Sequence, residues 1–390
     1  MNIVFFTHPS FSDHQSMPRF AKMLTDGMKE RGHHVQIWAP RAKFRQLVKT
    51  SFFKKWFGYV DQYVLFPRQV KKMLKSVHQD SLFVFTDNAL GPWVPLVAER
   101  PHVIHCHDFL AQRSAKEEIE ENKTSWTGKQ YQNLIKSGYS QGNNFISVSQ
   151  KTQQDLHRFL NRTPKISEVV YNGLNRNFKP GNIPTVRKEL SQYFKMDLTK
   201  GFILHVGGNQ WYKNRIGLLK IYDAWREISS NKLTLLCIGE APNDIIFSKY
   251  LSSKFTSSIH FLKDVPDEML KKAYVGASAF IFPSLDEGFG WPIAEAMASG
   301  TPVMTTNRMP MTEVTNGTGI AIDRMPFEKE EQEIWAIESA RKLESLIIMS
   351  PEQKQQMIKE QVQNAARFKK DTALDSIEDI YLQVLEKYEY

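Results

Sequence analysis

The sequence predicts an α/β protein with two doubly wound domains. Short apolar runs alternate with helix-like segments along most of the 390 residues, a pattern typical of parallel sheets with right-handed crossovers. The runs are continuously apolar, which indicates sheets covered on both faces. A Pro- and Gly-containing cluster at residues 180–184 separates two series of such runs and is the expected linker.

The first half contains six expected strands. Gly32 suits the position after the C-terminus of a helix over residues 22–31, and Ser149 suits the N-cap of a helix that includes residues 155–160. The expected strands are residues 3–7, 35–39, 82–86, 102–107, 145–148 and 168–171.

The second half repeats the pattern with helices between its strands. No strand is evident after Asp323, and residues from about 330 to 390 are expected to be helical, with breaks at Pro351 and near residues 368–371. The expected strands are residues 202–206, 233–238, 259–262, 279–282, 302–305 and 319–322.

Composition excludes several classes of protein. Hydrophobic residues make up 41% and charged residues 24%, which is ordinary for a globular protein. No apolar run is long enough for a membrane span, and the N-terminus lacks the features of a signal peptide. Two cysteines, Cys106 and Cys237, are too few for a disulfide framework, and we expect buried thiols in a reducing compartment.

The net positive charge is local. Residues 41–75 contain ten Lys or Arg and one acid, and ten minus one equals the net charge of +9 of the whole chain. Aromatic side chains are interleaved with these cations, as at the interface of an anionic membrane. A surface segment with aromatics packed into the core has the same composition, and single-stranded nucleic acid is a third, less favoured partner.

The stretch from residue 282 to residue 302 carries the most informative motif. A strand is expected to end near Pro283, and Pro292 suits the first turn of a helix that ends at Gly300. Glycines in the connecting loop let its backbone N–H groups face a ligand just before the positive end of the helix. Glu287 and Glu295 can both face the crevice at the carboxyl ends of the strands. A plain strand–turn–helix with a capping acid would contain the same two glutamates.

The whole stretch closely resembles the donor-site signature of glycosyltransferase family 4, a family of retaining enzymes with the GT-B fold. The two glutamates of the family, separated by seven residues, match Glu287 and Glu295, and its Gly-Phe-Gly matches residues 288–290. The resemblance implies that Glu287, Phe289 and Gly290 orient the transferred sugar and that Glu295 holds the ribose hydroxyls.

A second segment, residues 204–214, predicts a phosphate site. A strand, a glycine turn and a helix start with a lysine form a phosphate-binding arrangement, and Lys213 resembles the lysine with which the family holds the donor diphosphate. Gly208 stands where the family has an arginine, so one cation is missing. Whether Arg215 replaces it stays open, and the less favoured alternative for Lys213 is a solvated lysine at a helix start.

The remaining landmarks are weaker. Residues 260–270 resemble the segment that pairs the nucleobase edge with backbone groups. The run 105–108 resembles the His-Asp motif of the family, which implies that His107 faces the cleft and that Asp108 orients its imidazole; metal ligation by this His-x-His run and a structural histidine are the alternatives. Ser16 can cap a helix and offer its hydroxyl to a phosphate, or cap alone.

Together these observations predict two Rossmann-like domains facing a cleft. The first domain, on the acceptor side, is expected over residues 1–180, completed by a C-terminal helix that crosses back at about residues 373–390. The second domain, which is expected to bind the nucleotide-sugar, covers residues 185–372. The catalytic candidates are Glu287, His107 and Lys213. The donor-binding candidates are Gly208, Asn209, Lys213, Leu262, Val265, Gly288, Phe289, Gly290, Glu295 and Ser16.

The expected function is retaining transfer of a hexosyl unit from a nucleotide-sugar to a hydroxyl of a glycan or lipid-linked acceptor, in cell-surface polysaccharide or glycan assembly. No metal, cofactor or nucleic acid is expected. The expected location is the cytoplasm, with residues 41–75 a candidate contact to the inner face of the membrane. The alternatives are a sugar-nucleotide epimerase of the same fold and a non-catalytic basic membrane-binding protein. A dinucleotide dehydrogenase is disfavoured, because no Gly-x-Gly-x-x-Gly follows the first strand.

Overall fold

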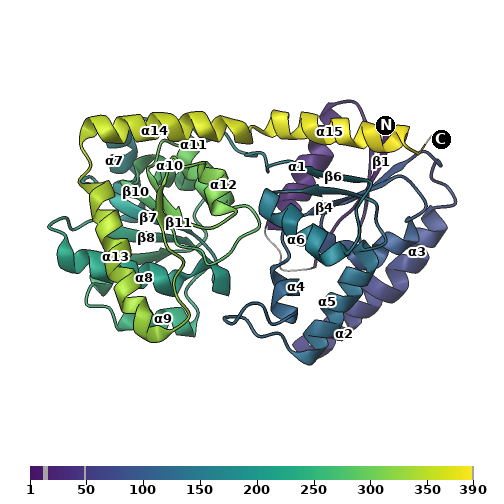
Figure 1. Ribbon diagram of the computed structural model, residues 1–390, viewed down its shortest axis with the longest axis horizontal. Coiled ribbons are helices and arrows are strands. Elements are labelled where there is room, and N and C mark those ends of the chain that lie inside the picture. The colour runs from purple at the N-terminus through teal and green to yellow at the C-terminus, as the bar shows by residue number, and fades with distance from the viewer. Residues whose placement is uncertain (12–15, 48–49, 389–390) are drawn as a thin grey trace. The chain divides into compact units, whose positions relative to one another are not determined.

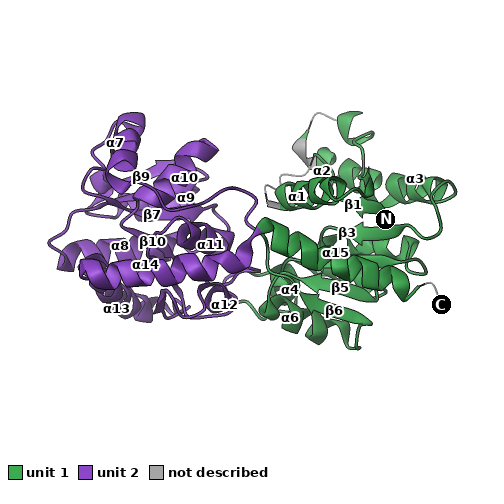
Figure 2. Cartoon of the chain, turned by 90° about the horizontal axis from the view of Figure 1, so that it is seen from above, with its two compact units in different colours: residues 1–119, 123–173, 370–390 green, residues 120–122, 174–369 purple. Residues whose placement is uncertain are grey.

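The structure of the protein is a computed structural model that describes residues 1–11, 16–47 and 50–388, with residues 16, 51 and 52 described by their backbone alone. Contacts divide the chain into two units (Figure 2). Unit 1 comprises Met1–Ile119, Lys123–Gly173 and Lys370–Tyr390, and unit 2 comprises Glu120–Asn122 and Leu174–Lys369.

The boundary between the units lies a few residues earlier than the predicted linker. Leu174 donates its backbone N–H to the carbonyl of Phe368 at 2.7 Å, and the ring of Phe178 packs edge-on against Tyr274 at 5.7 Å. These contacts hold residues 174–178 in unit 2, so the Pro- and Gly-containing cluster at 180–184 lies inside that unit.

Unit 1 is built on a parallel six-stranded sheet in the order β2-β1-β3-β4-β5-β6 (Figure 1). Each strand lies within two residues of its predicted position, because continuous apolar runs marked all six. The strands are β1 (Asn2–Phe6), β2 (His34–Trp38), β3 (Leu82–Phe85), β4 (His102–Cys106), β5 (Asn144–Ser147) and β6 (Ile166–Val169).

Helices cover both faces of this sheet. Side chains from α3, η3, α5 and α6 form a core on one face, and α1 and α15 pack together on the other. The helices are α1 (Ser16–Glu30), η1 (Arg45–Leu47), α2 (Ser51–Val60), the π-helix η2 (Asp61–Leu65), α3 (Phe66–Met73), η3 (Asn88–Leu96), α4 (Leu110–Ala115), α5 (Trp126–Tyr139), α6 (Gln150–Leu160) and α15 (Lys370–Glu386).

The C-terminal helix α15 belongs to unit 1, as predicted. Arg31 donates to Asp375 at 2.6 Å, and Glu378 accepts from His33, also at 2.6 Å. At the buried side of the helix, the hydroxyl of Tyr381 lies 2.7 Å from Nε2 of His105 in β4. The last helix of the chain therefore completes the first unit.

Unit 2 is built on a second parallel sheet, in the order β12-β11-β10-β7-β8-β9. The chain order reverses between β7 and β10, and open α/β sheets bind ligands at the carboxyl ends of the strands beside such a reversal. The strands are β7 (Phe202–Gly207), β8 (Thr234–Gly239), β9 (Ile259–Leu262), β10 (Ala279–Phe282), β11 (Val303–Thr306) and β12 (Ile320–Ile322).

Two layers of helices enclose this sheet (Figure 1). Helices α8, α9 and α13 cover one face, and α7, α10, α11, α12 and α14 cover the other. The helices are α7 (Ile183–Phe194), η4 (Trp211–Lys213), α8 (Arg215–Ile228), α9 (Asp244–Leu251), η5 (Thr256–Ser258), α10 (Asp267–Gly276), α11 (Trp291–Ala298), α12 (Met311–Thr315), α13 (Lys329–Ile347), α14 (Pro351–Ala365) and η6 (Ala366–Phe368).

Candidate functional site

The site in unit 2 is centred on an ion pair between its two predicted catalytic residues. Nζ of Lys213 lies 2.7 Å from Oε1 of Glu287, and the hydroxyl of Ser284 donates to the same oxygen at 2.9 Å. The side chain of Glu287 is 8% exposed and that of Lys213 is 15% exposed. Burial raises the pKa of Glu287, and the neighbouring Lys213 and Ser284 offset only part of that rise.

Two loops meet at this pair and are joined by hydrogen bonds. The loop between β10 and α11 carries Glu287, and the turn between β7 and α8 carries Lys213. The backbone N–H of Leu285 donates to the carbonyl of Tyr212 at 2.7 Å, and the amide of Asn214 donates to the carbonyl of Pro283 at 2.9 Å. The loops are thus held together before any ligand arrives.

The loop after β10 has the backbone that the sequence predicted. Gly290 adopts a φ of +106° directly before α11, a conformation that other residues rarely adopt. Pro292 lies in the first turn of α11. Phe289 differs from the expectation in one respect, because its ring is buried against Phe368 at 5.4 Å, and its side chain is therefore committed to packing in unit 2.

Glu295 is placed by α11 with its carboxylate toward α10. It is 3% exposed, and its Oε2 accepts a hydrogen bond from the hydroxyl of Tyr274 at 2.8 Å. Contact with ribose hydroxyls stays a prediction for this residue. Leu262, at the end of β9, and Val265, in the following loop, are both half-buried.

The glycine turn after β7 contains an acid that the sequence analysis missed. Oε2 of Glu240 accepts the backbone N–H of Asn209 at 3.0 Å, and a Cβ atom on Gly208 would lie 3.0 Å from Oε1 of the same side chain. One of the backbone donors predicted for the diphosphate is therefore engaged by Glu240. Glu240 lies two residues after the predicted strand 233–238, at the same edge of the sheet as the predicted site, and this position is the signal that could have identified it.

Arg215 lies beneath this turn and is 2% exposed. Its Nη1 donates to the side chain of Asn209 at 2.6 Å and to the carbonyl of Glu240 at 2.9 Å, and its guanidinium lies 4.9 Å from the ring centroid of Phe261. Within the described ranges, its Nε and Nη2 are buried without a hydrogen-bond partner. Arg215 thus links the segments that follow β7 and β8 to β9.

In unit 1, His107 directly follows β4 and is 7% exposed. Its Nε2 lies 3.0 Å from the carbonyl of Thr86; because a carbonyl only accepts, Nε2 carries the proton and Nδ1 the lone pair of the neutral ring. Burial lowers the pKa of His107, which favours this neutral form. The carbonyl of Thr86 therefore orients the ring, whereas Asp108, expected in that role, accepts the N–H of Leu110 at 3.0 Å.

The two histidines of the His-x-His run have different surroundings. His105 contacts Tyr381, and burial lowers its pKa to about 3. Among the residues that the structure describes, no group of three or more His, Cys, Asp or Glu side chains is placed to hold a metal ion.

A second polar pair in unit 1 was not predicted. Nε2 of His8, after β1, lies 2.8 Å from Oδ2 of Asp87, after β3. Burial alone would raise the pKa of Asp87, but the contact with His8, the nearby His107 and the N–H of Ala89 outweigh it and lower the pKa to about 2. β1 and β3 flank the reversal of strand order in this sheet, so the pair lies at the ligand-binding edge of unit 1.

The basic segment forms η1, α2, η2 and α3. Asp61, its one acid, is buried and accepts the backbone N–H groups of Lys43, Phe44 and Arg45 at 3.0–3.1 Å. Some of its apolar side chains enter the core, as Phe66 does, whereas Leu47 is 76% exposed and Trp56 is 54% exposed. No described helix is both long and apolar enough to cross a membrane.

One predicted site residue and one cation of the basic segment cannot be placed. Helix α1 begins at Ser16, whose side chain lies outside the described set, and Lys49 of the basic segment lies outside the described residues.

Two protein-family models match this chain in succession. The model described as "Glycosyltransferase Family 4" matches residues 17–178, and the one described as "Glycosyl transferases group 1" matches residues 200–338. Among curated proteins, O-antigen chain mannosyltransferase B of Escherichia coli is 32% identical over 126 residues, which are 32% of this chain and 33% of that protein. O-antigen chain mannosyltransferase RfbU of Salmonella typhimurium is 26% identical over 185 residues, 47% of this chain and 48% of that protein. These matches thus span a third to about half the length of each relative.

Solved structures share the fold over nearly the whole chain. HepE of Anabaena, in complex with UDP and glucose, has a TM-score of 0.67 at 17% identity and covers 97% of this chain and 99% of its own. Sucrose-phosphate synthase of Thermosynechococcus elongatus has a TM-score of 0.73 at 15% identity, with coverages of 99% and 100%. These likenesses confirm the predicted fold class.

Proposed function

This chain belongs to the group 1 glycosyltransferases of glycosyltransferase family 4, and on that premise we propose that it is a retaining hexosyltransferase that uses a nucleotide-sugar. The proposed acceptor is a hydroxyl group of a glycan or lipid-linked glycan. Because relatives of this chain are named as O-antigen mannosyltransferases and as a capsular polysaccharide biosynthesis glycosyltransferase, we place the reaction in cell-surface polysaccharide assembly.

The single observation that carries the proposal is the Lys213–Glu287 ion pair between two loops at the carboxyl edge of the sheet. A half-buried cation at a glycine turn stabilises a departing diphosphate, and a carboxylate held 2.7 Å away is placed to orient the sugar. Both side chains are fixed before binding, as efficient electrostatic catalysis requires.

In the proposed reaction, the bond between the anomeric carbon and the diphosphate oxygen breaks, and its electron pair leaves with the nucleoside diphosphate. Lys213 stabilises that negative charge, while Glu287 orients the ring through its oxocarbenium-like transition state. The acceptor hydroxyl attacks from the face that the diphosphate leaves and gives its proton to the departing phosphate. This scheme assigns the diphosphate charge to protein groups and requires no metal.

A panel of nucleotide-sugars tests the proposal. The purified protein is incubated with UDP-, GDP- and ADP-linked hexoses, with and without candidate acceptors, and released nucleoside diphosphate and glycosylated product are measured. We expect hydrolysis or transfer with one donor, with the α- or β-configuration of the donor kept in the product. A sugar product still attached to the nucleotide would instead identify an epimerase, and inertness toward every donor would contradict the proposal.

His107 is expected to act in transfer and not in donor binding. His107→Ala should lower the rate of transfer by about 10²-fold, the scale expected when a reacting group loses its orientation. Donor binding should persist, because Lys213, the cation proposed for the diphosphate, belongs to unit 2. Nucleoside diphosphate affinity, measured by calorimetry, should stay within twofold of the wild type. His34→Ala, at an exposed position on β2, is the matched control. A parallel collapse of donor binding would show that His107 is structural.

The basic segment is proposed to bind anionic membranes. Each Lys or Arg near an anionic surface contributes on the order of 1 kcal/mol, and exposed aromatics such as Trp56 add a part that resists salt. We expect the protein to float with vesicles rich in anionic lipid and much less with neutral vesicles. The replacements Lys49→Gln, Lys54→Gln, Lys55→Gln and Lys71→Gln should together release it without lowering activity on a soluble acceptor analogue.

A matched variant controls for net charge. Its four replacements to Gln, at exposed positions of unit 2, remove the same charge elsewhere and should leave vesicle binding intact; they are Lys188, Lys195, Lys200 and Lys232. Equal binding to neutral and anionic vesicles, or none to either, would leave a solvated basic face as the interpretation.

A further inference from the structure

Arg215 is a cation in a costly place, the first residue of α8. The N-terminal end of a helix repels positive charge, and burial of a charge costs free energy unless an ion pair and hydrogen bonds compensate it. The residue is 2% exposed, and its Nη1 bonds to an amide and a carbonyl, not to a carboxylate. Within the described ranges, Nε and Nη2 are buried without a hydrogen-bond partner. Proteins break such rules mainly at functional sites, so this arginine is a candidate for a role beyond folding.

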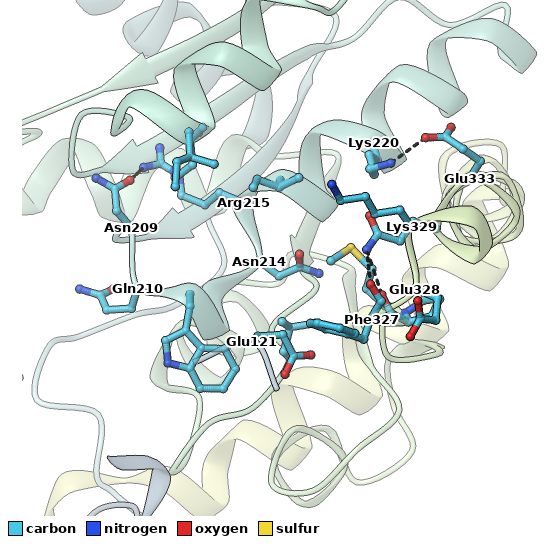
Figure 3. Close-up of a pocket in the computed structure, with 18 of the residues that line it drawn as sticks. Glu121, Asn209, Gln210, Asn214, Arg215, Lys220, Phe327, Glu328, Lys329 and Glu333 are labelled. Carbon is cyan, nitrogen blue, oxygen red and sulfur yellow. Dashed lines mark hydrogen bonds and ion pairs between the residues drawn. The ribbon is translucent and has the colours of Figure 1, made fainter. Parts of the chain in front are cut away.

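The guanidinium of Arg215 supports the glycine turn after β7. Figure 3 shows its bond to the side chain of Asn209, at one side of a pocket that both residues line. The same Nη1 donates to the carbonyl of Glu240 at 2.9 Å, and Nδ2 of Asn209 donates to the carbonyl of Ala241 at 2.6 Å. These bonds tie the turn to the segment that follows β8, and they fix the direction of the backbone N–H groups of the turn before a ligand binds.

Arg215 is too deeply buried to bind a diphosphate by contact. Its Nη1 is used by Asn209 and Glu240, and its Nε and Nη2 have almost no exposed surface. The influence of Arg215 on a ligand must therefore pass through the turn or through the electric field of its charge. Such a field is stronger in the protein interior than in water, because the effective dielectric constant is lower.

The charge of Arg215 completes a balance of charges at the turn. Nζ of Lys213 faces Oε1 of Glu287 at 2.7 Å. The carboxylate of Glu240 accepts the backbone N–H of Asn209 at 3.0 Å. With Arg215, two cations therefore face these two acids. Without Arg215, two acids would face one cation, and the turn would repel a negatively charged diphosphate.

His205 lies against the turn and is influenced by both cations. It is fully buried in β7, and a Cβ atom on Gly207 would lie 3.1 Å from its Nε2. Burial lowers the pKa of His205 to about 3, and the charges of Arg215 and Lys213 contribute to that lowering. The two cations therefore act on the same place beneath the glycine turn.

We propose that Arg215 is the positioning residue of the diphosphate site. It holds the glycine turn in place and supplies, from beneath and without contact, the positive charge that the family has in an arginine at the position of Gly208. The proposal rests on the proposed use of a nucleotide-sugar and names the group that makes up for the missing arginine. Because Arg215 acts through its charge, its effect should be larger for a nucleoside diphosphate than for the monophosphate, which carries less negative charge.

Calorimetry of the full chain with UDP, GDP, ADP and the corresponding monophosphates tests this role. In Arg215→Met, the dissociation constant of the diphosphate that the wild type binds should rise about tenfold or more, the scale of one charge acting through the protein. The dissociation constant of the corresponding monophosphate should rise about threefold at most, so the preference for the diphosphate falls. Arg215→Lys keeps the positive charge and should recover part of that preference.

Arg187→Met, on α7, is the matched control. The guanidinium of Arg187 also bonds to a carbonyl and a side chain, since it donates to the carbonyl of Gly276 at 2.8 Å and to the hydroxyl of Ser278 at 3.0 Å. Because these bonds lie outside the glycine turn, the control should leave both dissociation constants unchanged.

The outcomes separate this proposal from the one on which it rests. A wild type that binds no nucleoside diphosphate would overturn the proposed function. With that affinity present, an Arg215→Met variant that keeps the preference for the diphosphate, or that loses affinity for both ligands equally, would overturn the role of Arg215, since a loss of packing weakens both. An Arg215→Lys variant that behaves like Arg215→Met would overturn it as well. Calorimetric melting confirms that each variant is folded, and Arg215→Gln, which keeps a polar group beside Asn209, replaces an Arg215→Met variant that does not fold.

Discussion

Replacement of Glu287 by alanine is expected to lower kcat by about 10²-fold or more, the scale on which one oriented electrostatic contact acts. The replacement removes the carboxylate that lies 2.7 Å from Nζ of Lys213 and leaves that half-buried ammonium without this partner. The kcat of the variant is measured in steady-state assays with the nucleotide-sugar that the donor panel identifies as active. Glu287→Gln keeps the volume of the side chain and removes only the charge, so it should lose nearly as much.

Glu338→Ala, which removes an exposed carboxylate from α13, is the control and should keep full activity. A correctly folded Glu287→Ala enzyme with wild-type kcat would end the assignment of a catalytic role to this residue.

The same carboxylate sets an expectation for pH dependence. Burial raises the pKa of Glu287 above its ordinary value, so Glu287 takes up a proton, and its pair with Lys213 is lost, at a higher pH than for a solvated glutamate. In the profile of kcat against pH, the fall on the acid side should therefore occur at a higher pH than the titration of an ordinary carboxyl group. This fall is the acid limb of the profile. Glu287→Gln should flatten that limb, since no ionisation remains at this position.

Replacement of Lys213 by methionine is expected to weaken nucleoside diphosphate binding by roughly 1.5–3 kcal/mol, the contribution of a hydrogen bond to a charged group. Glu295→Gln should weaken binding on the same scale if its carboxylate turns from Tyr274 to the ribose. Calorimetry with UDP and GDP measures both variants. Lys232→Met, at an exposed position of unit 2, controls for the loss of positive charge. Unchanged nucleoside diphosphate affinity in both variants would show that the donor binds at another place.

The strands could be predicted because burial on both faces leaves a local trace in the sequence. Each apolar run read as a strand appears in one of the two sheets within about two residues. Helix η3 could not be predicted in this way. Its nine residues include Pro92 and Pro95, and proline in a local sequence pattern indicates the end of a helix and not its interior. Its fold depends on close packing against α5, where a Cβ atom on Gly138 would lie 2.1 Å from the carbonyl oxygen of Gly91.

In the site, too, the positions of residues along the chain could be predicted, whereas contacts between residues far apart in the sequence could not. The sequence places Glu287 and Lys213 at the carboxyl edge of one sheet, but not their hydrogen bond, which joins residues 74 positions apart. The pair of His8 and Asp87 spans 79 positions, and neither residue has a motif around it. Side-chain direction also escaped prediction, since α11 directs the carboxylate of Glu295 to Tyr274.

The position of helix α15 in the chain has a consequence for folding during synthesis on the ribosome. Unit 1 begins at the first residue and is completed by Lys370–Glu386, so about two hundred residues of unit 2 emerge before the first unit can close. During that time the face that Tyr381 and Leu374 later cover stays open to water, and such apolar surface is recognised by chaperones. Unit 2, being almost continuous in the chain, can fold first. The order of assembly is therefore the reverse of the order of synthesis, and a chain that ends before Lys370, and so lacks α15, loses a wall of the unit that was made first.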